Sequence, residues 1–175
     1  MPSQDEFKNP GRSSGRVAVC ALLTTLAMLL SYIDSLIPIL PQIPGIKLGL
    51  ANIVILTALY MLKGRYALLI NILRIVLTGL LFSGAVYMLY SLFGALFSFL
   101  VMYILKKSGL FSVVGVSLAG GAAHNAGQLF AAILLVSNVN LIRYLPVLVI
   151  SGVITGILTG MICLILLKRL KPACL

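Results

Sequence analysis

Residues 66–105 read YALLINILRIVLTGLLFSGAVYMLYSLFGALFSFLVMYIL, a run of 40 residues with one charge, Arg74. A helix that crosses the hydrocarbon core of a bilayer, about 30 Å thick, needs about 20 apolar residues. The run is therefore long enough for two crossings. Ser83-Gly84-Ala85 lie at its centre and predict a tight turn between two antiparallel membrane helices.

The rest of the chain has the same apolar character. It is 61% hydrophobic and only 9% charged, whereas a soluble domain carries about 25% charged residues. The sequence predicts an all-α integral membrane protein, a six-transmembrane-helix bundle over residues 17–170, between tails 1–16 and 171–175. We interpret the first run as a retained anchor, because no small-residue cleavage site follows it. The six apolar segments are 17–33, 48–62, 66–84, 85–105, 110–136 and 144–167.

The basic residues predict the orientation of this bundle. They occur in short clusters between apolar runs, which is the pattern of membrane topology and not of a nucleic-acid-binding patch. Lys and Arg stay in the cytoplasm during insertion. We therefore expect both ends in the cytoplasm of a bacterial cell, N-in and C-in, with only Lys47 and Arg143 on the outer connections. The cytoplasmic group comprises Lys8, Arg12, Arg16, Lys63, Arg65, Lys106, Lys107, Lys168, Arg169 and Lys171.

The outer connection 34–47 combines three prolines, Pro38, Pro41 and Pro44, with several Leu and Ile residues. The prolines exclude a regular helix. Irregular backbone near membrane depth is tolerated only against protein or a water-lined cavity. The segment is therefore either a stiff apolar connector or a lid over a ligand cavity.

Arg74 is the most informative residue of the sequence. It lies about 13 Å along the third helix from Arg65, where a charge costs several kcal/mol. Asn71 shares its helix face, one turn earlier. A direct pair with Asp34 is not expected, because the two residues differ in depth. Arg74 either binds an anionic or carbonyl-rich ligand in an outward-facing cavity, or it snorkels or bonds helix carbonyls.

The fifth segment contains a polar cluster, GGAAHNAGQ at 120–128. His124 and Gln128 share a helix face that Asn125 borders, and polar side chains at this depth avoid lipid. The cluster is either structural or part of a ligand site. Metal binding is not expected, because further ligands are absent. The upper wall of the same cavity is predicted to include Lys47, Asn52, Tyr87 and Tyr90.

Small residues recur at helical spacing and predict close helix packing. Gly152, Gly156 and Gly160 form one such row, and a second row is Ala119, Ala123, Gly127 and Ala131. Both rows are predicted to pack inside the bundle. A third row on the first helix, Ala18, Ala21 and Thr25, could contact a partner subunit.

The sequence lacks the motifs of an enzyme. It has no phosphate-binding loop, so ATP hydrolysis would have to come from a partner. Its only acidic residues are Asp5, Glu6 and Asp34. These cannot supply a catalytic carboxylate pair, a Ser–His–Asp set or the Asp-rich magnesium site of a prenyl diphosphate synthase. We therefore predict no enzymatic activity and no cofactor.

Three stretches carry a family resemblance: PGIKLGLANIV at 44–54, the segment around Arg74, and GGAAHNAGQ at 120–128. Over roughly residues 16–170 the chain resembles the Gx transporter or heptaprenyl diphosphate synthase component I family. That family is similar to the S components of energy-coupling factor (ECF) transporters. These are six-helix proteins that capture a vitamin or other micronutrient, join a membrane scaffold and two ATPases, and are thought to topple to release their cargo.

The resemblance implies an outer substrate cavity gated by segment 34–47, and a scaffold contact through Ala-x-x-x-Ala on the first helix. This sequence departs from that pattern, because Thr25 follows Ala21. The sequence thus favours a substrate-binding S component for a small, anionic ligand. The alternative is a non-catalytic membrane partner or anchor for isoprenoid, quinone or flavin-redox enzymes. The predicted substrate-binding residues are Arg74, Asn71, His124, Asn125, Gln128, Lys47 and Asn52.

Overall fold

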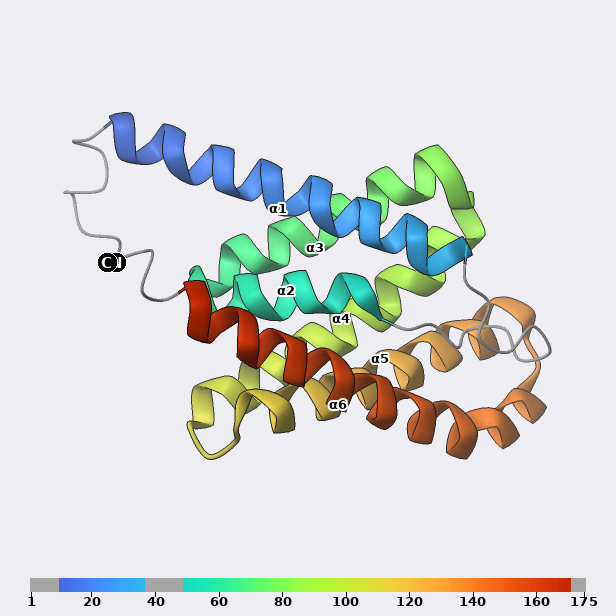
Figure 1. The fold of residues 1–175 in the computed structure, drawn as a ribbon. Coiled ribbons are helices and arrows are strands. Elements are labelled where there is room, and N and C mark those ends of the chain that lie inside the picture. The colour runs from blue at the N-terminus through green and yellow to red at the C-terminus, as the bar shows by residue number, and fades with distance from the viewer. Residues whose placement is uncertain (1–9, 37–48, 171–175) are drawn as a thin grey trace.

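The computed structural model describes residues 10–36 and 49–170, and every regular element in these ranges is a helix (Figure 1). The long helices run back and forth along one common direction, as expected for a membrane bundle. The elements are α1 (Pro10–Leu36), α2 (Leu50–Met61), α3 (Gly64–Thr78), the π-helical turn η2 (Gly79–Ser83), α4 (Ala85–Ser108), α5 (Val113–Val136), the 3-10 helix η3 (Val139–Tyr144) and α6 (Leu145–Leu170).

Five helical stretches are long and apolar enough to cross a membrane, which confirms the all-α, multi-pass membrane character of the chain. They are Ser14–Leu36, Gly64–Ser83, Ala85–Ser108, Val113–Val136 and Val139–Leu170. The second predicted segment forms α2, which has only 12 residues. At 1.5 Å per residue α2 is about 18 Å long, so it is too short to cross a core of about 30 Å by itself.

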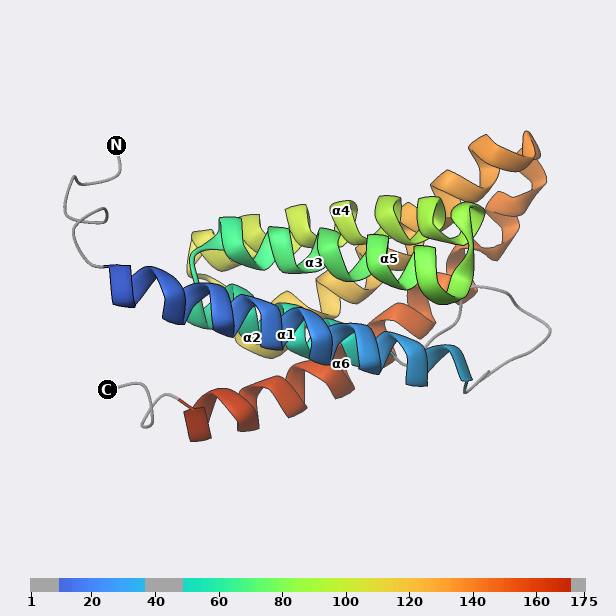
Figure 2. The same cartoon turned by 90° about the horizontal axis from the view of Figure 1, so that it is seen from above.

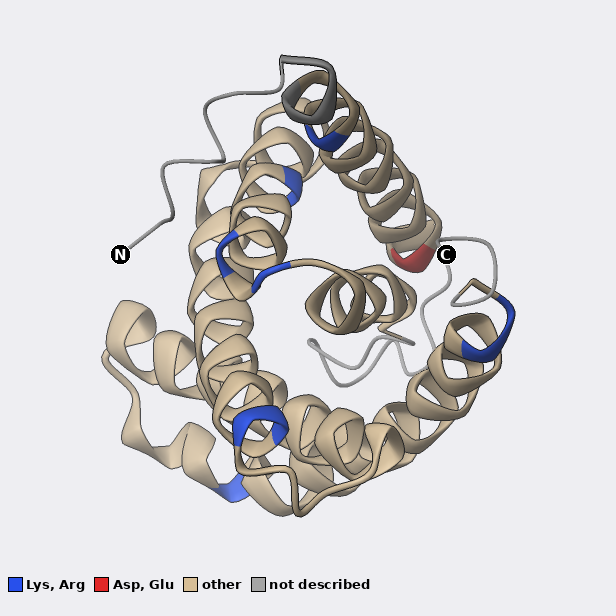
Figure 3. Ribbon diagram, turned by 90° about the vertical axis from the view of Figure 1, so that its left-hand side faces the viewer, with Lys and Arg blue, Asp and Glu red and all other residues tan. Residues whose placement is uncertain are grey.

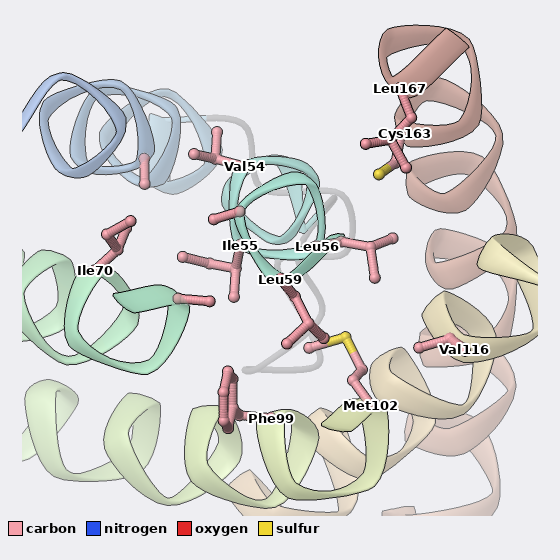
Figure 4. Packing of buried hydrophobic residues seen from close by; sticks show 13 residues of the cluster. Val54, Ile55, Leu56, Leu59, Ile70, Phe99, Met102, Val116, Cys163 and Leu167 are labelled. Carbon is pink, nitrogen blue, oxygen red and sulfur yellow. The ribbon is translucent and has the colours of Figure 1, made fainter. Parts of the chain in front are cut away.

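Helix α2 lies in the centre of the bundle, surrounded by the other helices (Figure 3). Its buried residues run without a break from Ile53 to Leu59, and side chains from several sides of the helix point toward α1, α3, α4 and α6 (Figure 4). A helix that is apolar all round is normally buried. This composition explains why the shortest helix, and not one of the long ones, occupies the centre.

An apolar cluster fills one half of the bundle around α2 (Figure 4). Near the end of α4, Lys106 contacts two residues of α2. Its Nζ donates a hydrogen bond to the carbonyl of Leu59 and lies 5.1 Å from the Tyr60 ring centroid. Cys163 is fully buried in this cluster and acts there as a packing residue. The apolar cluster comprises Ala27, Val54, Ile55, Leu56, Ala58, Leu59, Ala67, Ile70, Phe99, Met102, Val116, Cys163 and Leu167.

Helices α5 and α6 pack against each other through glycines, which confirms the predicted packing role of the row on α6. A Cβ atom at either Gly121 or Gly152 would collide with the backbone of the other residue. A Cβ atom at Gly156 would also come too close to backbone, at 2.8 Å from the carbonyl oxygen of Ser117. A hydrogen bond of 3.0 Å between the hydroxyls of Ser117 and Thr159 ties the same two helices together.

The two ends of the bundle differ in charge. Helix α1 begins and α6 ends at the same side in both side views (Figures 1 and 2). The view onto this end shows Lys and Arg on several helices around its rim (Figure 3). We call it the basic end. Its described basic residues are Arg16, Lys63, Arg65, Lys106, Lys107, Lys168 and Arg169.

Several boundaries differ from the sequence prediction. Asp34 belongs to α1, which continues to Leu36, so the predicted loop 34–47 begins with helix. One acidic residue near the end of a helix of 27 residues does not end the helix, and Asp34 accepts a hydrogen bond from Gly49 at the start of α2. Segment 37–48 lies outside the described residues. The turn at Gly84 is confirmed, with a φ of +80° that glycine adopts readily. The connection after α5 forms η3.

Candidate functional site

A polar cavity of about 70 Å³ lies at the end of the bundle opposite the basic end. It is bounded by the end of α1, the start of α2, the end of α3 with η2, the start of α4, and the middle of α5 and α6. Apart from Ile75, Met88 and three glycines, every lining residue has a polar side chain. The lining residues are Ser31, Asp34, Gly49, Asn52, Arg74, Ile75, Thr78, Gly79, Ser83, Tyr87, Met88, Ser91, Gly121, His124, Asn125, Gln128 and Thr155.

Arg74 lies in the wall of this cavity, and only 8% of its surface is exposed. Its Nε donates a hydrogen bond of 3.0 Å to Oδ1 of Asn71, and its Nη1 donates one of 2.9 Å to Oγ of Ser31. Asn71 in turn donates a long bond of 3.5 Å to the carbonyl of Ala95 on α4. These contacts fix the guanidinium at the cavity, so Arg74 does not snorkel away from the bundle.

Asp34 joins the two helices at the mouth of the cavity. Its Oδ2 accepts a hydrogen bond of 3.0 Å from the backbone N–H of Gly49, the N-cap residue of α2. A carboxylate at a helix N-terminus is stabilised by the free N–H groups and the helix dipole. Asp34 lines the same cavity as Arg74, and its negative charge stabilises the guanidinium. Asp34 and Arg74 thus line one cavity although they differ in depth, and the expectation that they form no direct pair stays a prediction.

The polar cluster of α5 divides into two roles. His124 and Gln128, one turn apart, line the cavity, as does Asn125. The amide nitrogen of Asn125 is directed to α6, however, where it donates to the carbonyl of Leu148 at 2.7 Å and to Oγ of Ser151 at 3.1 Å. Asn125 thus ties α5 to α6 at the edge of the cavity.

Of the other residues predicted for the site, some lie at the cavity and others do not. Asn52 and Tyr87 line the cavity, whereas Tyr90 does not. Asn71 supports Arg74 from outside the lining. Lys47 lies outside the described residues, so its predicted role stays a prediction.

Sequence reasoning missed the hydroxyls of the cavity. Ser31, Thr78, Ser83, Ser91 and Thr155 all line it. Two of them had a detectable signal, since Thr78 lies four residues after Arg74 and Ser91 four residues after Tyr87, on the same helix faces. Single Ser and Thr residues are common in membrane helices, where they bond their own backbone, so the others carried no signal.

The predicted partner face on α1 is exposed. Ala18, Ala21 and Thr25 all face away from the bundle, and the Thr25 hydroxyl bonds the Ala21 carbonyl at 3.0 Å. Large apolar side chains flank them, with Val17 and Leu22 each about two-thirds exposed. This face can meet either lipid or another membrane protein.

The described residues of the cavity have the chemistry to recognise a polar ligand, and they do not provide the groups of a metal centre. Among the described residues, no three His, Cys, Asp or Glu side chains come together. The described cavity therefore offers one guanidinium, one carboxylate, an imidazole, and neutral amides and hydroxyls. Such a set can recognise charge and hydrogen-bonding pattern.

A family model described as "Heptaprenyl diphosphate synthase component I" matches residues 23–166. The chain belongs to this family. The match spans all six α-helices at least in part, together with every residue that lines the cavity, which confirms the resemblance seen in the sequence. Comparisons with curated proteins and with solved structures give no match.

Proposed function

We propose that this family member is a substrate-capturing membrane subunit, of the S-component type, that binds a small anionic ligand from outside the cell. The observation that carries the proposal is a buried arginine in the wall of a polar cavity. Moving a charge into an apolar bundle costs several kcal/mol. A protein that only had to fold could place an apolar residue at position 74, whereas a ligand site needs the cation.

The proposal includes the topology. Six helical passages with both ends in the cytoplasm would put the basic end inside and the cavity toward the outside. The distribution of Lys and Arg supports this orientation through the positive-inside rule. The short α2, which follows segment 37–48 in the chain, would begin at the outer side. Its neighbouring helices would shield it from lipid.

The proposal also includes partners. The sequence has no ATP-binding loop, so energy for uptake would come from a separate module, a membrane scaffold with two ATPases. The exposed face of α1 at Ala18, Ala21 and Thr25 is the docking surface that we favour. Small residues there would let another helix approach closely.

A second candidate function is suggested by the name of the family. The words "component I" of a synthase imply another component, and the chain would then be a non-catalytic membrane partner of an isoprenoid enzyme. The basic end offers that partner a positively charged surface. This candidate requires no ligand in the cavity and gives Arg74 no role.

Affinity purification of the full chain from its own membrane, followed by mass spectrometry of what co-purifies, separates the two functions. The S-component proposal predicts a membrane scaffold and ATPases, and an Ala21→Leu substitution should reduce their recovery. Leu22→Ala, at the next position on the exposed side, is the control. Recovery of a prenyl diphosphate synthase subunit, with no ATPase, would favour the second function and contradict the first.

A further inference from the structure

Arg74 and Thr78 on α3 both line the cavity, and each has a polar group that makes no hydrogen bond among the described residues. An arginine has five N–H donors, and Arg74 uses its Nε and one N–H of Nη1 on Asn71 and Ser31. The structure gives Nη2 no acceptor within residues 10–36 and 49–170. One turn further along, the buried hydroxyl of Thr78 also makes no hydrogen bond in this part of the chain.

Buried polar groups are normally hydrogen-bonded, so these two call for an explanation. Arg74 and Thr78 are four residues apart, on one face of α3, and both line the cavity. A guanidinium and a hydroxyl at this spacing can donate to the same oxyanion. Charge-assisted bonds of this kind are about twice as strong as neutral ones.

The size of the cavity limits what else the ligand can contain. An engineered apolar cavity of about 150 Å³ binds benzene, and ligand sites for drug-sized molecules measure about 300–1,000 Å³. The cavity here has about 70 Å³. It therefore accepts only a few non-hydrogen atoms.

The chemistry of the walls points in the same direction. Among the described residues of the lining, only Ile75 and Met88 have apolar side chains, while Asn52, Gln128 and Thr155 offer amides and a hydroxyl. A prenyl chain would leave these polar groups without hydrogen bonds, at a cost of about 1–3 kcal/mol each. A flavin ring could form hydrogen bonds, but it is too large for a cavity of about 70 Å³. A short molecule with further hydroxyl or amino groups would satisfy these polar groups.

We propose that the ligand is a small hydrophilic carboxylic acid, and that its carboxylate lies between Nη2 of Arg74 and Oγ1 of Thr78. This inference rests on the proposed function, because it names the class of ligand for the same cavity. It makes Thr78 a binding residue. It also excludes an isoprenoid diphosphate as the cavity's ligand, in spite of the family's description.

The test is thermal unfolding of the purified full chain in detergent at constant ionic strength. The probes are glycine, glycolate and lactate, their methyl esters, farnesyl diphosphate and flavin mononucleotide. We expect at least one acid to raise the melting temperature and its ester to have no effect. Thr78→Val should weaken the apparent affinity about tenfold, the effect of losing one hydrogen bond to a charged group.

Thr24→Val is the matched control. Thr24 is also buried in a membrane helix, but its hydroxyl bonds the carbonyl of Cys20 and it does not line the cavity. The Thr24→Val protein should bind the acid with the same affinity as the unmodified chain. Equal weakening by both substitutions would show an effect of folding and would overturn the role of Thr78.

Other outcomes overturn the ligand class in distinguishable ways. Stabilisation by farnesyl diphosphate or flavin mononucleotide, dependent on Arg74 and without any response to the acids, would refute the small acid but leave substrate capture intact. No response to any probe would mean that water alone satisfies Arg74 and Thr78, and would refute the inference. Substrate capture would then be decided by whether ATPases co-purify.

Discussion

The two halves of the bundle are built from the same helices but have opposite interiors. Toward the basic end, the apolar cluster around α2 is closed to water and has Leu59, Phe99 and Met102 at its centre. Toward the other end, the same helices surround a polar cavity with Arg74 in its wall. The first half buries apolar side chains in close contact, whereas the second leaves open space and buried charge.

This difference teaches that stability and binding are separated along the bundle axis. A filled apolar half gains dispersion contacts and holds the helices together. The polar half has fewer such contacts, and the packing of the apolar half holds its helices in place. Substitutions in the two halves should therefore have different consequences, and four of them test the separation.

The largest effect on folding is expected for Leu59→Ala. Leu59 is 0% exposed in the apolar cluster, and truncating a fully buried leucine costs about 2–5 kcal/mol. The free energy of unfolding in detergent should fall by this amount. Leu100→Ala, on the lipid-facing side of α4 at 57% exposure, should change it little. Equal losses for both variants would contradict the distinction between a packed half and a lipid-facing surface.

A smaller loss is expected for Gly152→Ala at the contact of α5 with α6. The added methyl group would meet the backbone of Gly121, and overpacking of this kind costs about 1–3 kcal/mol. Gly15→Ala, where a Cβ meets nothing within 4 Å, should be neutral or slightly stabilising, since alanine favours a helix. Thermal unfolding of both variants measures the difference. An unaffected Gly152→Ala protein would show that the helices are not in such close contact.

Asn125→Ala sharpens the comparison within the polar half. Its amide bonds α6 and not the open space, so we expect a loss of about 1 kcal/mol in unfolding free energy. Ligand affinity should change little. Gln128→Ala, one turn away, should show the reverse pattern. A large loss of ligand affinity without a loss of stability in Asn125→Ala would contradict this interpretation and would show that Asn125 binds the ligand.

The smallest effect is expected for Ser31→Ala. Its hydroxyl accepts from Nη1 of Arg74 and helps to orient the guanidinium, and one such bond contributes about 1 kcal/mol. Ligand affinity should fall a few-fold with little change in melting temperature. Ser35→Ala, whose hydroxyl bonds only the carbonyl of Tyr32 near the exposed end of α1, is the control. Identical affinities for the two variants would remove Ser31 from the site.

Much of this architecture could be predicted from the sequence. Hydropathy located the helices, Gly84 located the turn, and the rarity of charge in apolar helices singled out Arg74. These signals are local, and each has a strong physical cause. The central position of α2 was not predicted, because its composition fits both a membrane crossing and a buried core helix.

The composition of the cavity was predicted only in part. Arg74, His124 and Gln128 are costly in lipid and were therefore visible in the sequence. Ser31, Ser91 and Thr155 cost little free energy at any position of a membrane helix. Only the packing of the helices brings them together at the cavity. Whether a side chain such as Asn125 faces a cavity or a neighbouring helix depends on helix rotation, which spacing alone does not fix.

The central claim is that the cavity around Arg74 holds a ligand. Native mass spectrometry of the full chain, extracted gently from its own membrane, tests this most directly when the unmodified protein is compared with Arg74→Gln. We predict a small bound molecule on the unmodified protein and its loss from the variant, with both proteins folded. The same mass for both, equal to that of the bare polypeptide, would contradict the account.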